Sequence, residues 1–200
     1  LEFICRSGVK NIIICDYDKV QLSNLNRQIL FNETDIGKFK TDAAESKIKS
    51  IFPETQIIKL NIKLCENNID SILSEFKIDF AVDAIDSVRA KAELIMFLSA
   101  NKIPFISSMG AGGKTDISKI RADYIENTVN CRLSAGLKKK LRKKMKVEKN
   151  IMAVYSNEQQ KKAVYPDSDI PSKTINGTVA HITNTFGAYC ADYFFKASAV

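Results

Sequence analysis

Carboxylate side chains follow two short apolar segments of this sequence. Asp16 and Asp18 come directly after residues 12–15, and Asp86 comes shortly after residues 80–82. The first segment has the length and the β-branched side chains of a buried strand, and we interpret the second in the same way. Ligands of open α/β sheets bind beyond the carboxyl ends of the strands. We therefore expect these carboxylates to meet a ligand at one edge of a sheet.

Two cations lie between these carboxylates in the sequence. Arg27 belongs to the polar stretch 23–28, and Lys40 stands near the start of a predicted helix. Guanidinium and ammonium groups bind phosphate, whereas aspartates bind Mg²⁺ or the hydroxyls of a ribose. The combination predicts a site for ATP and its metal ion.

The composition is that of a globular protein with an ordinary core. The sequence has 200 residues, of which 45% are hydrophobic and 26% are charged. No apolar run approaches the roughly 20 residues that a membrane-spanning helix needs, and nothing at Leu1 has the pattern of a signal peptide. We therefore expect no transmembrane segment in this chain and a cytoplasmic location.

Cysteine and histidine are used sparingly. The five cysteines are scattered and form no Cys-x-x-Cys pair, so we expect reduced, mostly buried thiols and no structural zinc site. His181 is the only histidine. It falls in a predicted helix, where a packing or capping role is favoured over catalysis, and any Ser-His-Asp or Cys-His mechanism would depend on it alone.

One segment carries the whole net charge of +7. Residues 138–149 contain eight Lys or Arg and one acid, whereas the other residues contain 22 basic and 22 acidic side chains. Leu137, Leu141 and Met145 recur every four residues, which predicts a helix with one apolar edge. Its cations form either a solvated face or a contact with nucleic-acid phosphates, and both interpretations stay open. The candidate nucleic-acid contacts are Lys138, Lys139, Lys140, Arg142, Lys143 and Lys144.

Strand and helix patterns alternate over the first 110 residues. We predict strands at 11–15, 56–60, 79–82 and 104–107, and helices at 1–6, 38–52, 67–76 and 87–101. Such alternation is typical of an α/β, Rossmann-like, doubly wound and mostly parallel sheet. That sheet normally opens with a strand and a glycine-rich turn, and we expect both to lie before Leu1.

The alternation loosens after the glycine-rich residues 110–113. We predict a C-terminal extension with a basic helix at about 131–146, a strand at 152–155 and a last helix at about 177–196. Residues 1–110 are then the nucleotide-binding core of a single domain, and residues 111–200 its C-terminal part.

Several motifs together carry a family resemblance. They are Asp16-x-Asp18, residues 23–28, Gly37-x-x-Lys40 and residues 83–87. In combination they resemble the adenylation domain shared by ThiF, MoeB, HesA and the ubiquitin-activating enzymes. Residues 82–91, 101–104 and 110–116, followed by the basic helix, 164–166 and 185–187, are similar to the tRNA threonylcarbamoyladenosine dehydratase branch (TcdA/CsdL) of that family.

The resemblance implies a single ThiF-type adenylation domain over residues 1–200. Such an enzyme uses ATP and Mg²⁺ to activate the carboxylate of threonylcarbamoyladenosine next to a tRNA anticodon. The activated group is then attacked from within the same side chain, which closes a ring with net loss of water. The resemblance also implies a homodimer, and for a eukaryotic protein a possible place at the mitochondrial outer membrane.

Individual roles follow from the same resemblance. Asp16 matches the carboxylate that binds the ribose hydroxyls, and Asp86 matches the Mg²⁺ ligand. Arg27 and Lys40 match cations on the phosphates, with Arg27 as the main group that stabilises developing charge. The expected catalytic residues are Arg27, Lys40 and Asp86, and the expected ATP-binding residues are Asp16, Asp18, Asn24, Arg27, Gln28, Lys40, Asp86 and Ser87.

Two alternatives remain beside this interpretation. Bacterial relatives have a cysteine in the strand before the polar loop, where this sequence has Ala153, which argues against a thioester intermediate and leaves direct attack within the adenylate. The first alternative is an enzyme that adenylates the C-terminus of a ubiquitin-like or sulfur-carrier protein. The second is a non-catalytic nucleic-acid-binding module with a degenerate nucleotide fold.

Overall fold

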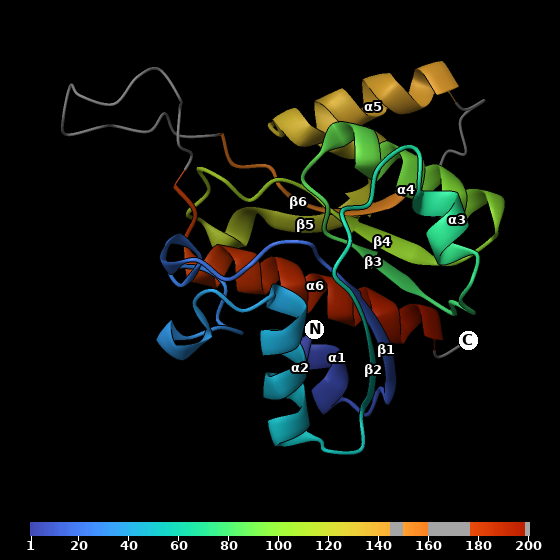
Figure 1. Ribbon diagram of the computed structural model, residues 1–200. Helices are drawn as coiled ribbons and strands as arrows, with labels where there is room; N and C mark the ends of the chain where they lie inside the picture. The colour runs from blue at the N-terminus through green and yellow to red at the C-terminus, as the bar shows by residue number, and fades with distance from the viewer. Residues whose placement is uncertain (145–149, 160–176, 199–200) are drawn as a thin grey trace. The chain divides into compact units, whose positions relative to one another are not determined.

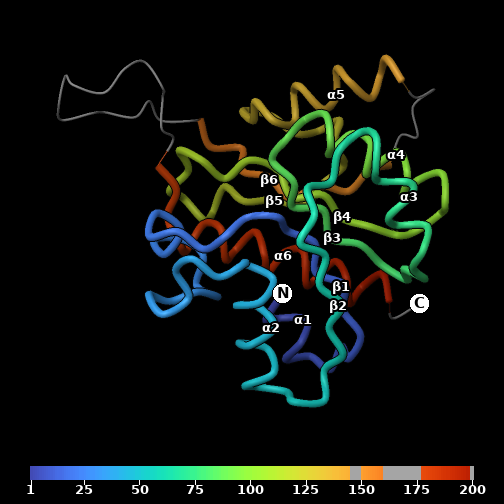
Figure 2. The backbone as a smooth tube through the Cα atoms, viewed as in Figure 1, coloured from blue at the N-terminus to red at the C-terminus, as the bar shows by residue number. Residues whose placement is uncertain are grey.

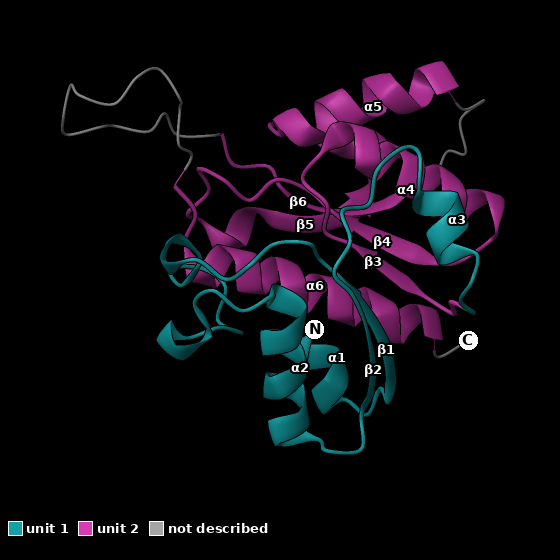
Figure 3. Cartoon of the chain, in the orientation of Figure 1, with its two compact units in different colours: residues 1–77 teal, residues 78–200 magenta. Residues whose placement is uncertain are grey.

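The chain forms an α/β structure with two compact units. The computed structural model describes residues 1–144, 150–159 and 177–198. The units comprise residues 1–77 and 78–200 (Figure 3). The first contains α1 (Glu2–Arg6), β1 (Asn11–Cys15), η1 (Leu22–Asn24), η2 (Glu33–Asp35), α2 (Lys40–Ile51), β2 (Gln56–Leu60) and α3 (Ile69–Leu73). The second contains β3 (Ala81–Asp83), α4 (Val88–Ala100), β4 (Phe105–Ser108), η3 (Ile117–Lys119), β5 (Ile120–Tyr124), η4 (Ile125–Asn127), α5 (Arg132–Lys144), β6 (Met152–Ser156) and α6 (Ala180–Ser198).

The first unit is built on a pair of parallel strands. β1 pairs with β2 in the register Asn11 with Gln56 through Cys15 with Leu60. α2 packs against β2 and carries the buried residues Ala43, Ala44 and Ile48. Between β1 and α2 the backbone makes a long excursion through the short helices η1 and η2 (Figure 2). This excursion carries most of the residues predicted to contact ATP.

The second unit has three layers (Figure 1). Its sheet has the order β3-β4-β6-β5, in which the first three strands are parallel and β5 runs antiparallel to β6. α4 and α5 cover one face and α6 covers the other. Along β6, Ala153 and Tyr155 join the core with α4 and α5, whereas Val154 joins the core with α6. The strand is buried on both faces, as the alternation of side chains along a strand requires.

The sequence prediction of an α/β fold with parallel strand pairing is confirmed, although element ends differ by a few residues. Strand β5 was missed. Arg121 and Asp123 alternate with Ile120 and Ala122, so the apolar face of this strand holds few residues. The last residues of the predicted basic helix, 145–146, and the motif 164–166 lie outside the described residues. The division of the chain at residue 110 stays a prediction.

Among the described helices, none combines the length and the hydropathy that crossing a bilayer requires.

Candidate active site

Two carboxylates and a lysine meet just beyond β1. The Asp16 N–H donates to Leu60 O at 3.2 Å, which extends the pairing of the two strands by one residue. The Asp18 N–H then donates to Asp16 Oδ1 at 2.9 Å, which turns the chain away from the sheet. Lys40 Nζ lies 2.8 Å from Asp18 Oδ2 and 3.7 Å from Asp16 Oδ2. The structure therefore brings together three of the residues predicted from the sequence.

Backbone contacts hold Lys40 in place at the start of α2. Its N–H donates to Asp18 O at 2.9 Å, and Lys19 pairs with Phe39 in an isolated antiparallel bridge. Its side chain is only 12% exposed, whereas those of Asp16 and Asp18 are 37% and 47% exposed. The carboxylates thus face solvent more than the lysine does, which leaves them accessible to a ligand.

The short helix η1 positions the remaining polar residues of this unit. Asn24 is buried, and its Oδ1 accepts the Gln21 N–H at 3.1 Å. Arg27 Nη1 donates to Ser23 O at 2.7 Å and to Asn26 Oδ1 at 2.9 Å. Gln28 Oε1 is buried and accepts no hydrogen bond from the described residues.

Asp86 and Ser87 lie in the second unit, on the loop between β3 and α4. Both are exposed, and Ser87 is the N-cap residue of α4, although its hydroxyl makes no capping hydrogen bond. In the described part of the chain, Asp86 makes no ion pair. Their participation in one site with Asp16 and Lys40 stays a prediction.

A buried polar cluster lies beneath this loop, and its importance was not predicted from the sequence. Asp83 and Lys91 form an ion pair of 2.8 Å in which both side chains are fully buried. Removing one partner of such a pair leaves an uncompensated charge and costs about 3–5 kcal/mol. Asp83 and Lys91 both lie in motifs that carry the family resemblance, and Asp83 was expected to be structural, but the pairing of the two was not predicted.

Lys114 is a second buried lysine that was not predicted. It lies after the glycine-rich turn, and its Nζ donates to Asn130 O at 3.0 Å and to Glu158 O. Burial lowers the pKa of Lys114, and the charges of Cys131 and Glu158 oppose this effect. The lysine therefore joins three segments that are far apart in the sequence.

The residues present fit a metal ion that arrives with its nucleotide. Among the described residues, no three His, Cys, Asp or Glu side chains cluster as an all-protein metal site would require. Mg²⁺ commonly keeps several waters and binds one or two carboxylates together with substrate phosphates. The partly exposed carboxylates of Asp16 and Asp18, with Lys40 beside them, are groups of the kind that this mode of binding uses.

Two of the cysteines are poorly suited to act as nucleophiles. All five are free. Burial, with a smaller effect of the neighbouring Asp16, raises the pKa of Cys15 to about 11, and burial raises the pKa of Cys190 to about 11. Thiols of this kind are protonated at neutral pH. Ala153 is buried inside β6, and His181 Nε2 lies 3.1 Å from the backbone oxygen of Thr115.

The cations of α5 differ in their surroundings, and Lys140 is half-buried. Leu137 and Leu141 are buried, Lys138 Nζ donates to Thr128 O at 2.8 Å, and Lys144 pairs with Glu93. On the opposite face, the exposed side chains are those of Arg132, Lys139, Arg142 and Lys143. Of these four, Lys139, Arg142 and Lys143 were predicted from the sequence and Arg132 was not.

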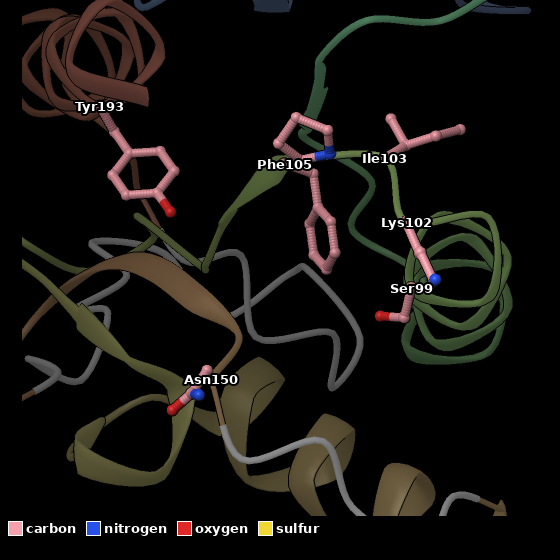
Figure 4. Close-up of a pocket in the computed structure, with 7 residues that line it drawn as sticks. Ser99, Lys102, Ile103, Phe105, Asn150 and Tyr193 are labelled. Carbon is pink, nitrogen blue, oxygen red and sulfur yellow. The ribbon is translucent and has the colours of Figure 1, made fainter. Parts of the chain in front are cut away.

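A hollow of about 330 Å³ lies elsewhere in the second unit. Phe105, Asn150 and Tyr193 line it (Figure 4). Phe105 begins β4 and Asn150 precedes β6, so the hollow lies at the amino ends of these strands. Within the second unit it therefore lies at the opposite strand ends from the loop 84–87.

Comparisons with known proteins all point to one protein family. The sequence pattern of the ThiF family matches residues 1–198. The tRNA threonylcarbamoyladenosine dehydratase of Escherichia coli is 33% identical over 174 residues, which cover 84% of this chain and 63% of that protein. The enzyme of the same name from Haemophilus influenzae is 31% identical over 211 residues, covering 100% of this chain and 78% of that protein. This chain thus spans less than two thirds of the E. coli relative.

The similarity extends to solved structures. The E. coli dehydratase TcdA in complex with ATP superposes with a TM-score of 0.87 at 30% identity, covering 98% of this chain and 78% of that one. Its complex with AMP gives a TM-score of 0.86 at 31% identity and the same coverage. Because the family pattern spans nearly the whole sequence and the described fold agrees with it, this chain belongs to the ThiF family.

Proposed function

We propose that this protein dehydrates threonylcarbamoyladenosine in tRNA by ATP-dependent adenylation of its carboxylate. The observation that carries the proposal is the similarity over 98% of the chain to a dehydratase solved with ATP. The cluster of Asp16, Asp18 and Lys40 supports it, because carboxylates and a cation lie where a sheet of this class binds nucleotides.

The reaction requires two steps. An oxygen of the substrate carboxylate bonds to the α-phosphorus of ATP as the bond to pyrophosphate breaks. A group in the same side chain then attacks the acyl carbon, and AMP leaves with the carboxylate oxygen. The net result is loss of one water from the nucleoside and closure of a ring.

The residues of the first unit have separate tasks in this scheme. Asp16 accepts hydrogen bonds from the ribose hydroxyls, the usual role of an acid at the end of a strand in this class of sheet. Lys40 and Arg27 bind phosphate oxygens, and Arg27 stabilises charge at the α-phosphate as pyrophosphate departs. Both cations must exchange a protein contact for the nucleotide, since Lys40 pairs with Asp18 and Arg27 donates to Ser23 O.

Other polar groups complete the proposed ATP site. Asn24 and Asp18 support the loop that faces the phosphates, and the unpartnered Gln28 Oε1 is available to a donor on the ligand. Asp86, with Ser87 beside it, would hold Mg²⁺. The ion would supply positive charge across the phosphates.

We further propose that the exposed face of α5 binds the phosphate backbone of the tRNA. Arg132, Lys139, Arg142 and Lys143 project from the face opposite Leu137 and Leu141. Contacts of this kind carry affinity without sequence information. Lys138, Lys140 and Lys144 belong to the sequence-based prediction, but Lys138 and Lys144 already bind protein groups.

We also propose a homodimer and a cytoplasmic location, or the mitochondrial outer membrane if the protein is eukaryotic. These proposals rest on the family resemblance. Size-exclusion chromatography with light scattering and cell fractionation test them.

The direct test uses the full-length protein with ATP, Mg²⁺ and tRNA that carries threonylcarbamoyladenosine. We expect a mass loss of one water on that nucleoside, and Arg27→Ala to abolish it. A protein that binds ATP but leaves the nucleoside unchanged would contradict the proposal. Unchanged activity in Arg27→Ala and Asp86→Ala, with loss of function on charge reversal in α5, would instead favour a non-catalytic nucleic-acid-binding module.

The second candidate is activation of a ubiquitin-like or sulfur-carrier protein. It is favoured by a similarity to the molybdopterin-synthase adenylyltransferase of E. coli, 29% identical over 53% of this chain. This enzyme class predicts ATP–pyrophosphate exchange that a small protein ending in Gly-Gly stimulates. The absence of Cys-x-x-Cys pairs and of a cysteine at position 153 speaks against it.

A further inference from the structure

Asp83 at the end of β3 uses both of its carboxylate oxygens. Oδ1 accepts the Ile85 N–H at 3.0 Å. Oδ2 accepts the Ser107 hydroxyl at 2.6 Å and lies 2.8 Å from Lys91 Nζ. One carboxylate thus joins β3 to β4, to α4 and to the loop 84–87.

Stability alone explains this arrangement poorly. Asp83, Lys91 and Ser107 are all buried, and the desolvation of a buried ion pair offsets most of its attraction, so apolar residues of the same volume often stabilise a fold equally well. Lys91 also lies in the first turn of α4, where its N–H donates to Ser87 O at 2.9 Å. The positive end of the helix dipole disfavours a cation there. The ion pair does, however, fix the orientation of the Asp83 carboxylate.

The loop that Asp83 holds carries Asp86. Its backbone is fixed on both sides of Asp86, by the bond from Ile85 N–H to Asp83 and by the bond from Lys91 N–H to Ser87 O. Asp86 is exposed, and its side chain makes no ion pair among the described residues. The buried cluster therefore determines where an exposed carboxylate is presented.

We propose that Asp83, Lys91 and Ser107 form a positioning device that holds the loop 84–87, so that Asp86 is presented to the metal ion of bound Mg²⁺–ATP. The inference rests on the proposed role of Asp86 in nucleotide binding. None of the three buried residues contacts the ligand. They act through the loop, as groups that orient metal ligands commonly do.

The test compares charge-neutral variants of the full-length protein. Asp83→Asn combined with Lys91→Met removes both charges and keeps the side-chain volumes similar. We expect a folded protein by circular dichroism whose affinity for ATP in Mg²⁺ falls about 10–100-fold, the usual effect of losing such orienting groups. Its affinity for ATP without Mg²⁺ stays unchanged, and the Ile85 amide exchanges its hydrogen faster.

Two milder variants test the inference if the double variant does not fold. Ser107→Ala removes one donor to Asp83 and is expected to weaken Mg²⁺-dependent ATP binding, whereas Ser107→Thr keeps a hydroxyl and restores it. Asp86→Asn alone should remove the Mg²⁺-dependent part of the ATP affinity. Combined with Asp83→Asn and Lys91→Met, the Asp86→Asn change should lower the ATP affinity little further, because all of these changes act through the carboxylate of Asp86.

The outcomes separate this inference from the proposed function. The inference is overturned if a folded Asp83→Asn/Lys91→Met variant binds ATP with the Mg²⁺ dependence of the wild-type protein. If the double variant does not fold, the same result in Ser107→Ala overturns it. A wild-type protein without Mg²⁺-dependent ATP binding would overturn both proposals. Normal Mg²⁺-dependent binding without dehydration of the nucleoside would overturn only the proposed reaction.

Discussion

Neutralising the exposed face of α5 should weaken tRNA binding in a salt-dependent way. Lys139, Arg142 and Lys143 are exposed and make no ion pair among the described residues. Replacing all three by glutamine removes three charges while Leu137 and Leu141 keep the helix packed. Each lost phosphate contact lowers the slope of log affinity against log salt by about 0.7–0.9, so we expect a decrease of about 2–3. Between 50 and 200 mM salt, the wild-type protein should therefore lose roughly 20–40-fold more affinity than the variant.

Fluorescence anisotropy with labelled tRNA over a salt series measures this slope. The matched control replaces Lys10, Lys47 and Lys119 by glutamine, since these lysines are exposed and lie outside α5. It has the same net charge as the α5 variant. An unchanged slope in the α5 variant, or an equal decrease in the control, would refute the assignment, because attraction would then follow net charge and not this face.

Three further changes separate binding from stability. Lys40→Met should lower ATP affinity about 10–100-fold in titration calorimetry, which is the value of a charge-assisted hydrogen bond. It should cost at most about 1 kcal/mol of stability, because its partner Asp18 is 47% exposed and screened by solvent. A loss of stability without a loss of affinity would contradict the role of Lys40 on phosphate. Leu137→Ala should lower the free energy of unfolding in urea by about 2–5 kcal/mol, because Leu137 is fully buried, whereas the exposed Leu22 should tolerate the same change within about 0.5 kcal/mol. Burial raises the pKa of Cys190 from 9.0 to about 11, so the folded state loses stability as the pH rises from 9 towards 11, because this thiol ionises less readily than in the unfolded chain. Urea unfolding at several alkaline pH values should show a loss that is smaller by about 2–3 kcal/mol in Cys190→Ala, where the raised pKa of Cys15 still contributes.

Local sequence patterns predicted most elements of the fold correctly. The β-branched residues before Asp16 indicated β1, and the spacing of Leu137 and Leu141 indicated α5 and its buried edge. These predictions succeed because the pattern of one short segment determines which of its faces is apolar. Strand β5 was missed because its few apolar residues become informative only once β6 and α6 cover them.

The candidate site also combines features that the sequence predicted with features that it did not. The motif around Asp16 and Lys40 identified polar residues that the structure then brings together. The burial of Lys91 and Lys114 could not be predicted, because a buried ammonium is tolerated only with partners such as Asp83 and Asn130 that lie elsewhere in the sequence.

The sequence by itself determined the ThiF family, the α/β class and the residues suited to phosphate, because residue type and spacing express these properties locally. Only the tertiary structure decided which cations of α5 are exposed, which lysines are buried, and that Asp83 accepts a hydrogen bond from the loop of Asp86. Those properties depend on contacts between distant segments. The free energy of a charged side chain is set by the partners and the solvent around it, and these exist only in the folded chain.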